Sequence, residues 1–208
     1  MSQARAEILA RIRGALADRP AVAEVAWTYG KAVGTGDLDA VERFVERVAD
    51  YRARVDRVDR DNTVAAIAAA LREAGAERVV ADVVVRAAWP DGARWIVDDA
   101  LSADDLDRVD AVVTTATVAI ANTGTIILDH GAGQGRRALS LVPDVHVCVV
   151  DVGQIVDDVP SAVTRLIELG RHTRPLTWIS GPSATSDIEL DRVEGVHGPR
   201  TLHVLVVG

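Results

Sequence analysis

The feature that most constrains the fold is the stretch 118–151, in which two apolar segments flank a glycine-rich loop. The segments 125–128 and 145–150 are rich in Val and Ile, which favour buried β-strands. The turn Asn122-Thr123-Gly124-Thr125 leads into the first segment, and the loop 131–137 separates the two. Strands that end in small-residue turns are where α/β proteins place ligand sites, because backbone N–H groups can approach a ligand closely there.

This strand pattern predicts an α/β fold in which a mostly parallel sheet is flanked by helices. Aromatic residues make up only 3% of the chain, so the core must consist of Ala, Val, Leu and Ile. Such cores are typical of helices packed on parallel strands, which read as continuous Val and Ile runs. We expect strands at 79–80, 94–97, 111–114, 118–121, 125–129, 145–150, 176–180 and 202–207. We expect helices at 37–51, with Asp37 as N-cap, at 63–74 and at 159–169.

Residues 1–36 predict a helical N-terminal extension, and residues 37–208 a single α/β domain. Within the extension, residues 2–18 predict a short amphipathic helix whose apolar face is formed by Ile8, Ile12 and Leu16. A helix this short is marginal in water, so we expect it to dock either on its own domain or on a partner subunit. Residues 19–36 contain Pro and Gly without periodicity, which is typical of a linker or arm.

The net charge of −8 argues against nucleic acid as the main partner, because phosphate binding usually shows as a basic face. A small anionic ligand remains compatible, since one Arg or a helix N-terminus can hold it. No apolar run approaches the roughly 18 residues of a membrane span, and the N-terminus lacks the apolar region of a secretory signal. We therefore expect a cytoplasmic protein.

The single cysteine, Cys148, lies inside an apolar segment. One cysteine allows no disulfide within the chain and cannot hold an iron–sulfur cluster, which normally needs several thiolates. No His-Glu-x-x-His motif and no Cys/His cluster occurs in the sequence, so we expect no metal site. A buried, inert thiol is the simplest interpretation of Cys148.

Two segments near the middle of the chain are candidate ligand sites. In Asn122-Thr123-Gly124-Thr125, two hydroxyls flank a glycine and can bind a carboxylate, phosphate or carbonyl, with a plain β-turn as the alternative. The loop 131–137 combines glycines with Arg136 and Arg137, which suits an anion clamp, with a mobile lid loop as the alternative. Arg136 stands where a dinucleotide-binding fingerprint needs its third glycine, so that motif is absent.

A third candidate segment is Gly181-Pro182-Ser183, which follows an expected strand. If a helix begins here, Ser183 or Thr185 can cap it and its N-terminus can hold an anion. If residues 187–191 are extended instead, alternate carboxylates share one face, namely those of Asp187, Glu189 and Asp191. Such carboxylates suit acid–base chemistry or a solvated strand.

A fourth candidate is the turn Val196-His197-Gly198-Pro199. The imidazole of His197 can titrate near neutral pH or hydrogen-bond to a ligand. A structural turn histidine is the alternative.

These segments, in this order, resemble the LUD-domain family of lactate-utilisation proteins, and in particular its small C-type subunits. The resemblance is specific from about residue 110 to the C-terminus and looser over 37–110. It is carried by Ala119-Ile120-Ala121-Asn122-Thr123-Gly124-Thr125-Ile126-Ile127-Leu128, Arg137-Ala138-Leu139-Ser140-Leu141 with Pro143, His146, Gly181-Pro182-Ser183, Asp187-Ile188-Glu189 and Gly195-Val196-His197-Gly198-Pro199.

The resemblance implies a fold like that of the sugar-phosphate isomerase and CoA-transferase superfamily. It also implies a role as one subunit of a multi-protein system that oxidises L-lactate to pyruvate. In such a system the iron–sulfur clusters lie on partner subunits, and we expect no cofactor in this chain.

The resemblance further implies a ligand pocket around Thr123, Gly124, Thr125, Gly181, Pro182, Ser183, Asp187, Glu189 and His197. Arg137 from the glycine-rich loop and Gly198 from the last turn complete the candidate ligand-binding residues. Family members often carry an acidic residue where this chain has Asn122, and an amide cannot act as a base at neutral pH. We therefore assign no general base and no catalytic residue.

The alternative function is a stand-alone enzyme or a sensor that binds a small anionic metabolite, such as a sugar phosphate, an acyl-CoA or a hydroxy acid. A subunit predicts little activity of the isolated chain. A stand-alone enzyme predicts turnover that is lost on Asp187→Asn or Glu189→Gln substitution.

Overall fold

The computed structural model describes residues 3–18, 31, 33–185, 193–194 and 197–208. The chain divides into two compact units, Met1–Lys31 and Ala32–Gly208. The first unit contains helix α1 (Gln3–Ala15), which is shorter than the expected helix at 2–18 and has no buried residue. Within the described residues, no helix is both long enough and apolar enough to cross a membrane.

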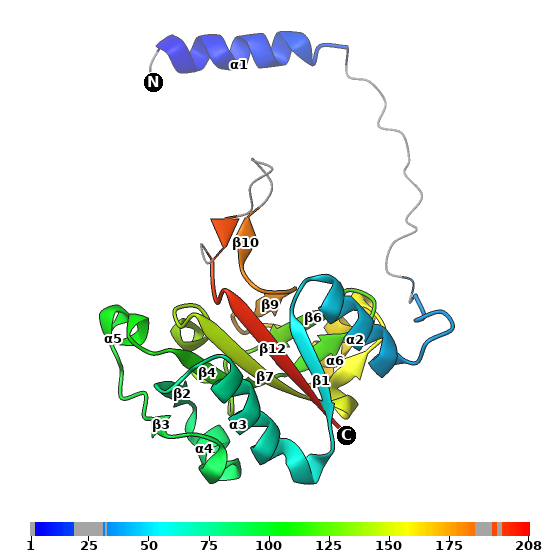
Figure 1. Cartoon of the computed structure of the whole chain (residues 1–208). Helices are drawn as coiled ribbons and strands as arrows, with labels where there is room; N and C mark the ends of the chain where they lie inside the picture. Colours follow the sequence, from blue (N-terminus) through cyan, green and yellow to red (C-terminus); the bar gives the residue numbers. More distant parts are fainter. Residues whose placement is uncertain (1–2, 19–30, 32, 186–192, 195–196) are drawn as a thin grey trace. The chain divides into compact units, whose positions relative to one another are not determined.

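The second unit is built on a six-stranded sheet in which every neighbouring pair of strands is parallel. The strand order is β1-β12-β7-β4-β2-β3, so β7 and β4 lie in the middle and β12 lies next to β7 (Figure 1). This arrangement confirms the expectation of a mostly parallel sheet. The strands are β1 (Arg54–Val58), β2 (Val79–Ala81), β3 (Trp95–Ile96), β4 (Ala111–Thr115), β7 (Val145–Asp151) and β12 (Thr201–Val207).

A second sheet has the strand order β8-β5-β6-β9. In it β6 runs antiparallel to both β5 and β9, whereas β5 and β8 are parallel. A two-stranded hairpin pairs β10 with β11. The bounds are β5 (Val118–Ile120), β6 (Thr125–Leu128), β8 (Ile155–Val156), β9 (Thr177–Ile179), β10 (Ala184–Thr185) and β11 (Val193–Glu194).

Helices cover both sheets and create separate core clusters. On one face of the six-stranded sheet, α3 (Thr63–Glu73) packs on Val147 and Val149 of β7. On the other face, α2 (Ala40–Asp50) and the second sheet pack on Cys148 and Val150. Helix α6 (Val159–Glu168) covers the outer face of the second sheet. The remaining helices are α4 (Val83–Ala88), α5 (Ala103–Asp107) and the short 3-10 turns η1 (Arg60–Asn62), η2 (Pro90–Gly92), η3 (Arg137–Ser140) and η4 (Val152–Gln154).

The structure corrects the expected start of one helix. The N-cap of α2 is Asp39 rather than Asp37, and its side chain accepts a hydrogen bond from the backbone N–H of Glu42. Asp37 and Asp39 flank Leu38, the first apolar residue of the expected helix, so the pattern alone does not choose between them. The sequence analysis also omits β1. This strand lies at the edge of the sheet and is half exposed, so its charged residues give no continuous apolar run.

Gly124 fixes the distance between the second sheet and α2. Its φ is +59°, and a Cβ atom at this position would lie 2.8 Å from the carbonyl carbon of Arg47 in α2. Only glycine adopts this conformation without strain and also leaves room for the helix backbone. The β5–β6 turn therefore carries its glycine for a structural reason.

We predict that Gly124→Ala lowers the free energy of unfolding by about 3 kcal/mol, because it adds a backbone clash to the strain of positive φ. Gly75→Ala is the matched control, since Gly75 has a φ of +66° but no atom within 4 Å of the added Cβ. In urea denaturation the control should lose about 1 kcal/mol of unfolding free energy, because only the strain of positive φ acts there. Equal losses in the two variants would contradict the packing role of Gly124.

Candidate functional site

One cavity of the second unit lies at the amino-terminal ends of β7 and β12. Its volume is about 230 Å³. Its lining comes from the end of η3, the starts of β7 and β12, strand β9 and the turns 180–183 and 197–199. Polar lining is supplied by Ser140, His146, Thr177, Ser180, Ser183 and His197, and apolar side chains by Leu141, Trp178, Ile179 and Leu202. Among the described lining residues there is no Asp, Glu, Lys or Arg.

His146 and Ser140 are the most deeply buried of the described polar residues that line this cavity. His146 lies on β7 between Val112 of β4 and Leu202 of β12, and only 1% of it is exposed. Its Nε2 is 2.7 Å from the hydroxyl of Thr114, whereas its Nδ1 has no hydrogen-bond partner. Burial lowers the pKa of His146 to about 4, because the interior disfavours the charged ring. The imidazole is therefore neutral at physiological pH.

A chain of hydroxyl groups links the β5–β6 turn to the cavity. The hydroxyls of Thr123 and Thr125 are 2.7 Å apart, and that of Thr125 is 2.8 Å from Ser180, which lines the cavity. Asn122 points its amide elsewhere, donating to the carbonyl of Val33 at 2.8 Å. The Thr-Gly-Thr turn thus positions a cavity residue rather than lining the cavity itself.

Two turns that are distant in sequence close one side of the cavity. The hydroxyl of Ser183 accepts a hydrogen bond from the backbone N–H of His197 at 3.0 Å. The backbone N–H of Ser183 donates to the carbonyl of Pro199 at 2.8 Å. These bonds hold the segments 181–183 and 197–199 together.

The structure brings five of the candidate residues into the cavity lining, namely Gly181, Pro182, Ser183, His197 and Gly198. Thr123 and Thr125 reach it through Ser180, and Gly124 packs against α2. Arg137 is exposed and begins η3, whose last residue is the lining residue Ser140. Asp187 and Glu189 lie outside the described residues.

The glycine-rich loop 131–137 is tied to the six-stranded sheet. The backbone N–H of Gly133 donates to Asp82 at 2.9 Å, and its carbonyl accepts from Thr115 at the end of β4. Arg136 binds both carboxylate oxygens of Asp98, at 2.7 and 2.9 Å, and this lowers the pKa of Asp98. The guanidinium of Arg136 is therefore engaged within the protein, and the loop is anchored at both ends.

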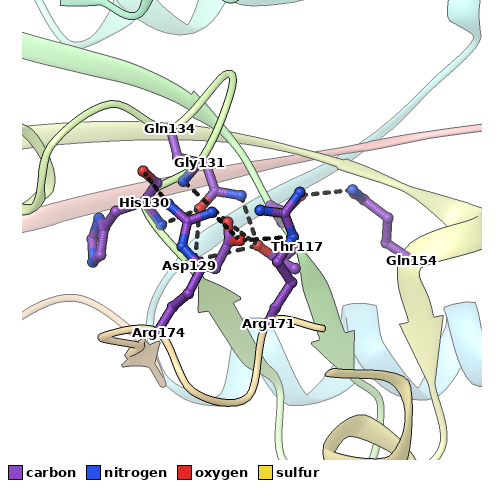
Figure 2. Close-up of polar contacts among 9 residues, drawn as sticks. Thr117, Asp129, His130, Gly131, Gln134, Gln154, Arg171 and Arg174 are labelled. Carbon is purple, nitrogen blue, oxygen red and sulfur yellow. Dashed lines mark hydrogen bonds and ion pairs between the residues drawn. The ribbon is translucent and has the colours of Figure 1, made fainter. Parts of the chain in front are cut away.

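A buried carboxylate organises the other polar cluster of the fold, drawn in Figure 2. Asp129 follows β6, and its side chain accepts hydrogen bonds from Thr117 at 3.0 Å and from the backbone of Gly131 at 3.1 Å. It also pairs with Arg174 at 3.1 Å and Arg171 at 3.4 Å. The carboxylate thus joins β6, the glycine-rich loop and the segment between α6 and β9.

A second cavity, of about 220 Å³, lies at the carboxyl ends of β4, β7 and β12. Its charged lining residues are Arg60 and Asp151, which form an ion pair with each other. Among the described residues, no three His, Cys, Asp or Glu side chains gather as a metal site. The cavity at His146 is therefore the better candidate, because it alone of these two combines room with an unpartnered polar atom.

Comparison with known proteins identifies the family. The model of the LUD domain matches residues 41–207. The Lactate utilization protein C of Deinococcus radiodurans is 46% identical over 210 residues, which cover 100% of this chain and 97% of that protein. The chain belongs to the LUD-domain family.

Other relatives match this chain over a shorter region. The Lactate utilization protein C of Shouchella clausii is 31% identical over 113 residues, which cover 53% of this chain and 49% of that protein. A crystal structure of a DUF162-family protein from Deinococcus radiodurans superimposes with a TM-score of 0.71 at 44% identity, covering 85% of this chain and 100% of that chain. The cavity at His146 lies entirely within the region that matches the LUD domain.

The sequence analysis did not identify several of the residues that line the cavity at His146. Ser140 and Ser180 carry no local signal, because isolated serines beside turns are common. His146 does carry one, since a histidine inside an apolar strand is an unusual buried polar group. Its position next to Ser183 and His197 depends on strand order, which the sequence pattern does not specify.

We predict that Asp129→Ala lowers the free energy of unfolding by about 3 kcal/mol, because it leaves two arginines and buried donors without their acceptor. Asp144→Ala is the control, since the Asp144–Arg200 pair is exposed on both sides. In chemical denaturation this variant should lose no more than about 0.5 kcal/mol of unfolding free energy. A similar small loss in Asp129→Ala would contradict the structural role of this carboxylate.

We also predict an acid sensitivity that originates in His146. Its folded-state pKa of about 4 lies below the ordinary value of 6.5, so the unfolded chain binds more protons between these values. The contribution of the neutral His146 ring to the free energy of unfolding is therefore fully present above pH 6.5, and it is lost as the pH drops towards 4. His146→Gln should reduce the loss of stability between pH 7 and pH 4 by about 3 kcal/mol relative to the unaltered protein. Identical pH profiles of unfolding would contradict the buried neutral imidazole.

Proposed function

We propose that this chain is a subunit of a multi-protein system that oxidises L-lactate to pyruvate. The observation that carries the proposal is the 46% identity to a Lactate utilization protein C over 100% of this chain and 97% of that protein. A match of this extent includes the cavity, the six-stranded sheet and the helices that cover it. It therefore supports a shared role rather than a shared fold alone.

In this proposal the electron-transfer centres lie on partner subunits that hold iron–sulfur clusters. The chain has one cysteine, which is buried in β7, and burial raises the pKa of its thiol to about 12. A protonated, isolated thiol is a poor ligand for such a cluster. This division of labour agrees with a cytoplasmic complex in which the present chain contributes a binding site.

The proposed fold family is the sugar-phosphate isomerase and CoA-transferase superfamily. The parallel six-stranded sheet with helices on its faces supports this assignment. The proposed ligand site is the cavity at His146, with Gly181, Ser183 and His197 at its rim. Its uncharged hydroxyl groups suit a small acid, because no carboxylate among the described lining residues repels an anion.

Deletion of the encoding gene in its host tests the proposed role. We predict that the deletion strain fails to grow on L-lactate as sole carbon source but grows normally on pyruvate, since only the oxidation step is lost. A plasmid copy of the gene should restore growth on L-lactate. Normal growth of the deletion strain on L-lactate, with no second lactate-oxidising activity in its extracts, would contradict the proposal.

A further inference from the structure

The Nδ1 atom of His146 has no hydrogen-bond partner although it is buried. A buried polar atom without a partner costs about 1–3 kcal/mol, so such atoms normally have a partner in the working protein. The surrounding strands do not provide one, because the contact with Thr114 uses the other ring nitrogen. His146 lines the cavity, which is the place from which a partner can come.

The cavity has the composition of a site for a small amphipathic acid. Its volume of about 230 Å³ is several times that of one water molecule, whose share of liquid volume is about 30 Å³. Hydroxyl groups of Ser140, Ser180 and Ser183 line it beside the apolar side chains of Leu141 and Leu202. The hydroxyls can donate to a carboxylate, and the leucines can contact a short alkyl group.

The hydrogen-bonding state of His146 selects the group that it can bind. At neutral pH the ring is uncharged, so it does not act as the counter-ion of a carboxylate. The Thr114 hydroxyl has one proton, which it can donate to Nε2 of His146 at 2.7 Å or to the sulfur of Cys148 at 3.7 Å. In the first case the ring proton is on Nδ1, which is then a donor, and in the second it is on Nε2, which leaves Nδ1 as an acceptor. A hydroxyl group suits both cases, because it can accept or donate a hydrogen bond.

We propose that this cavity binds a small 2-hydroxy carboxylic acid and that Nδ1 of His146 forms a hydrogen bond with its hydroxyl group. The inference rests on the proposed role in L-lactate oxidation, from which the acid class follows. It adds the location of the site and the residue that distinguishes such acids from simple carboxylic acids. His146 is thereby assigned as a ligand-binding residue.

Calorimetric titration of the full chain with L-lactate, pyruvate and propionate tests this assignment. Propionate matches L-lactate except for the hydroxyl group that we assign to His146. The unaltered protein should bind L-lactate at least about tenfold more tightly than propionate, because propionate leaves Nδ1 of His146 unpaired. His146→Leu should bind all three acids with similar, weak affinity.

His203→Leu is the matched control. His203 is also a buried histidine of the six-stranded sheet, but it bonds to Asp56 and lies outside this cavity. This variant should retain the preference for L-lactate over propionate. His146→Gln, which keeps a hydrogen-bonding side chain, provides a second test if His146→Leu does not fold, and it should keep part of the preference.

A nuclear magnetic resonance titration of the ¹⁵N-labelled unaltered protein reports on the same atom without any substitution. L-lactate should shift the Nδ1 resonance of His146, and propionate should leave it in place. The inference is wrong if no acid of the panel binds, if only water occupies the cavity, or if the preference for L-lactate is undiminished in His146→Leu or in His146→Gln. Failure of the proposed function has a different signature, which is normal growth on L-lactate of the deletion strain.

Discussion

The fold depends on the burial of β7 on both of its faces. This strand is hydrogen-bonded to β4 on one side and to β12 on the other, and alternate residues enter two separate cores. A strand in this position must be almost entirely apolar, because any polar side chain would lose its contact with water. His146 is the exception within its buried part, and it is tolerated at the start of the strand, where Thr114 and a cavity lie beside it.

The candidate site lies at the amino-terminal ends of the strands, which is uncommon for an open parallel sheet. In open parallel sheets, ligands usually bind beyond the carboxyl ends of the strands, where the strand order reverses. Here that reversal lies between β2 and β4, and the glycine-rich loop covers it through Asp82 and Thr115. The second sheet and the turns at 181–183 and 197–199 instead enclose space at the amino-terminal ends of β7 and β12.

The sequence pattern predicts the α/β class correctly, and five of its candidate ligand-binding residues line the cavity at His146. Continuous Val and Ile runs predict buried strands, and they locate β4, β6, β7 and β12 within a residue or two. Small-residue turns also drew attention to Ser183 and His197, which the structure joins by a hydrogen bond. The antiparallel second sheet was not foreseen, because periodicity identifies a strand but not its neighbours. Arg136 shows a related limit, since its partner Asp98 is 38 residues away and no local pattern links the two.

The central claim is that the cavity at His146 holds the acid on which the proposed system acts. A crystal structure of the full chain soaked with L-lactate tests this most directly. We predict density for the ligand in this cavity, with its hydroxyl oxygen about 3 Å from Nδ1 of His146 and its carboxylate among the serine hydroxyls. Ligand density beside Arg60 and Asp151 at the carboxyl ends of the strands, or water alone next to His146, would contradict the claim.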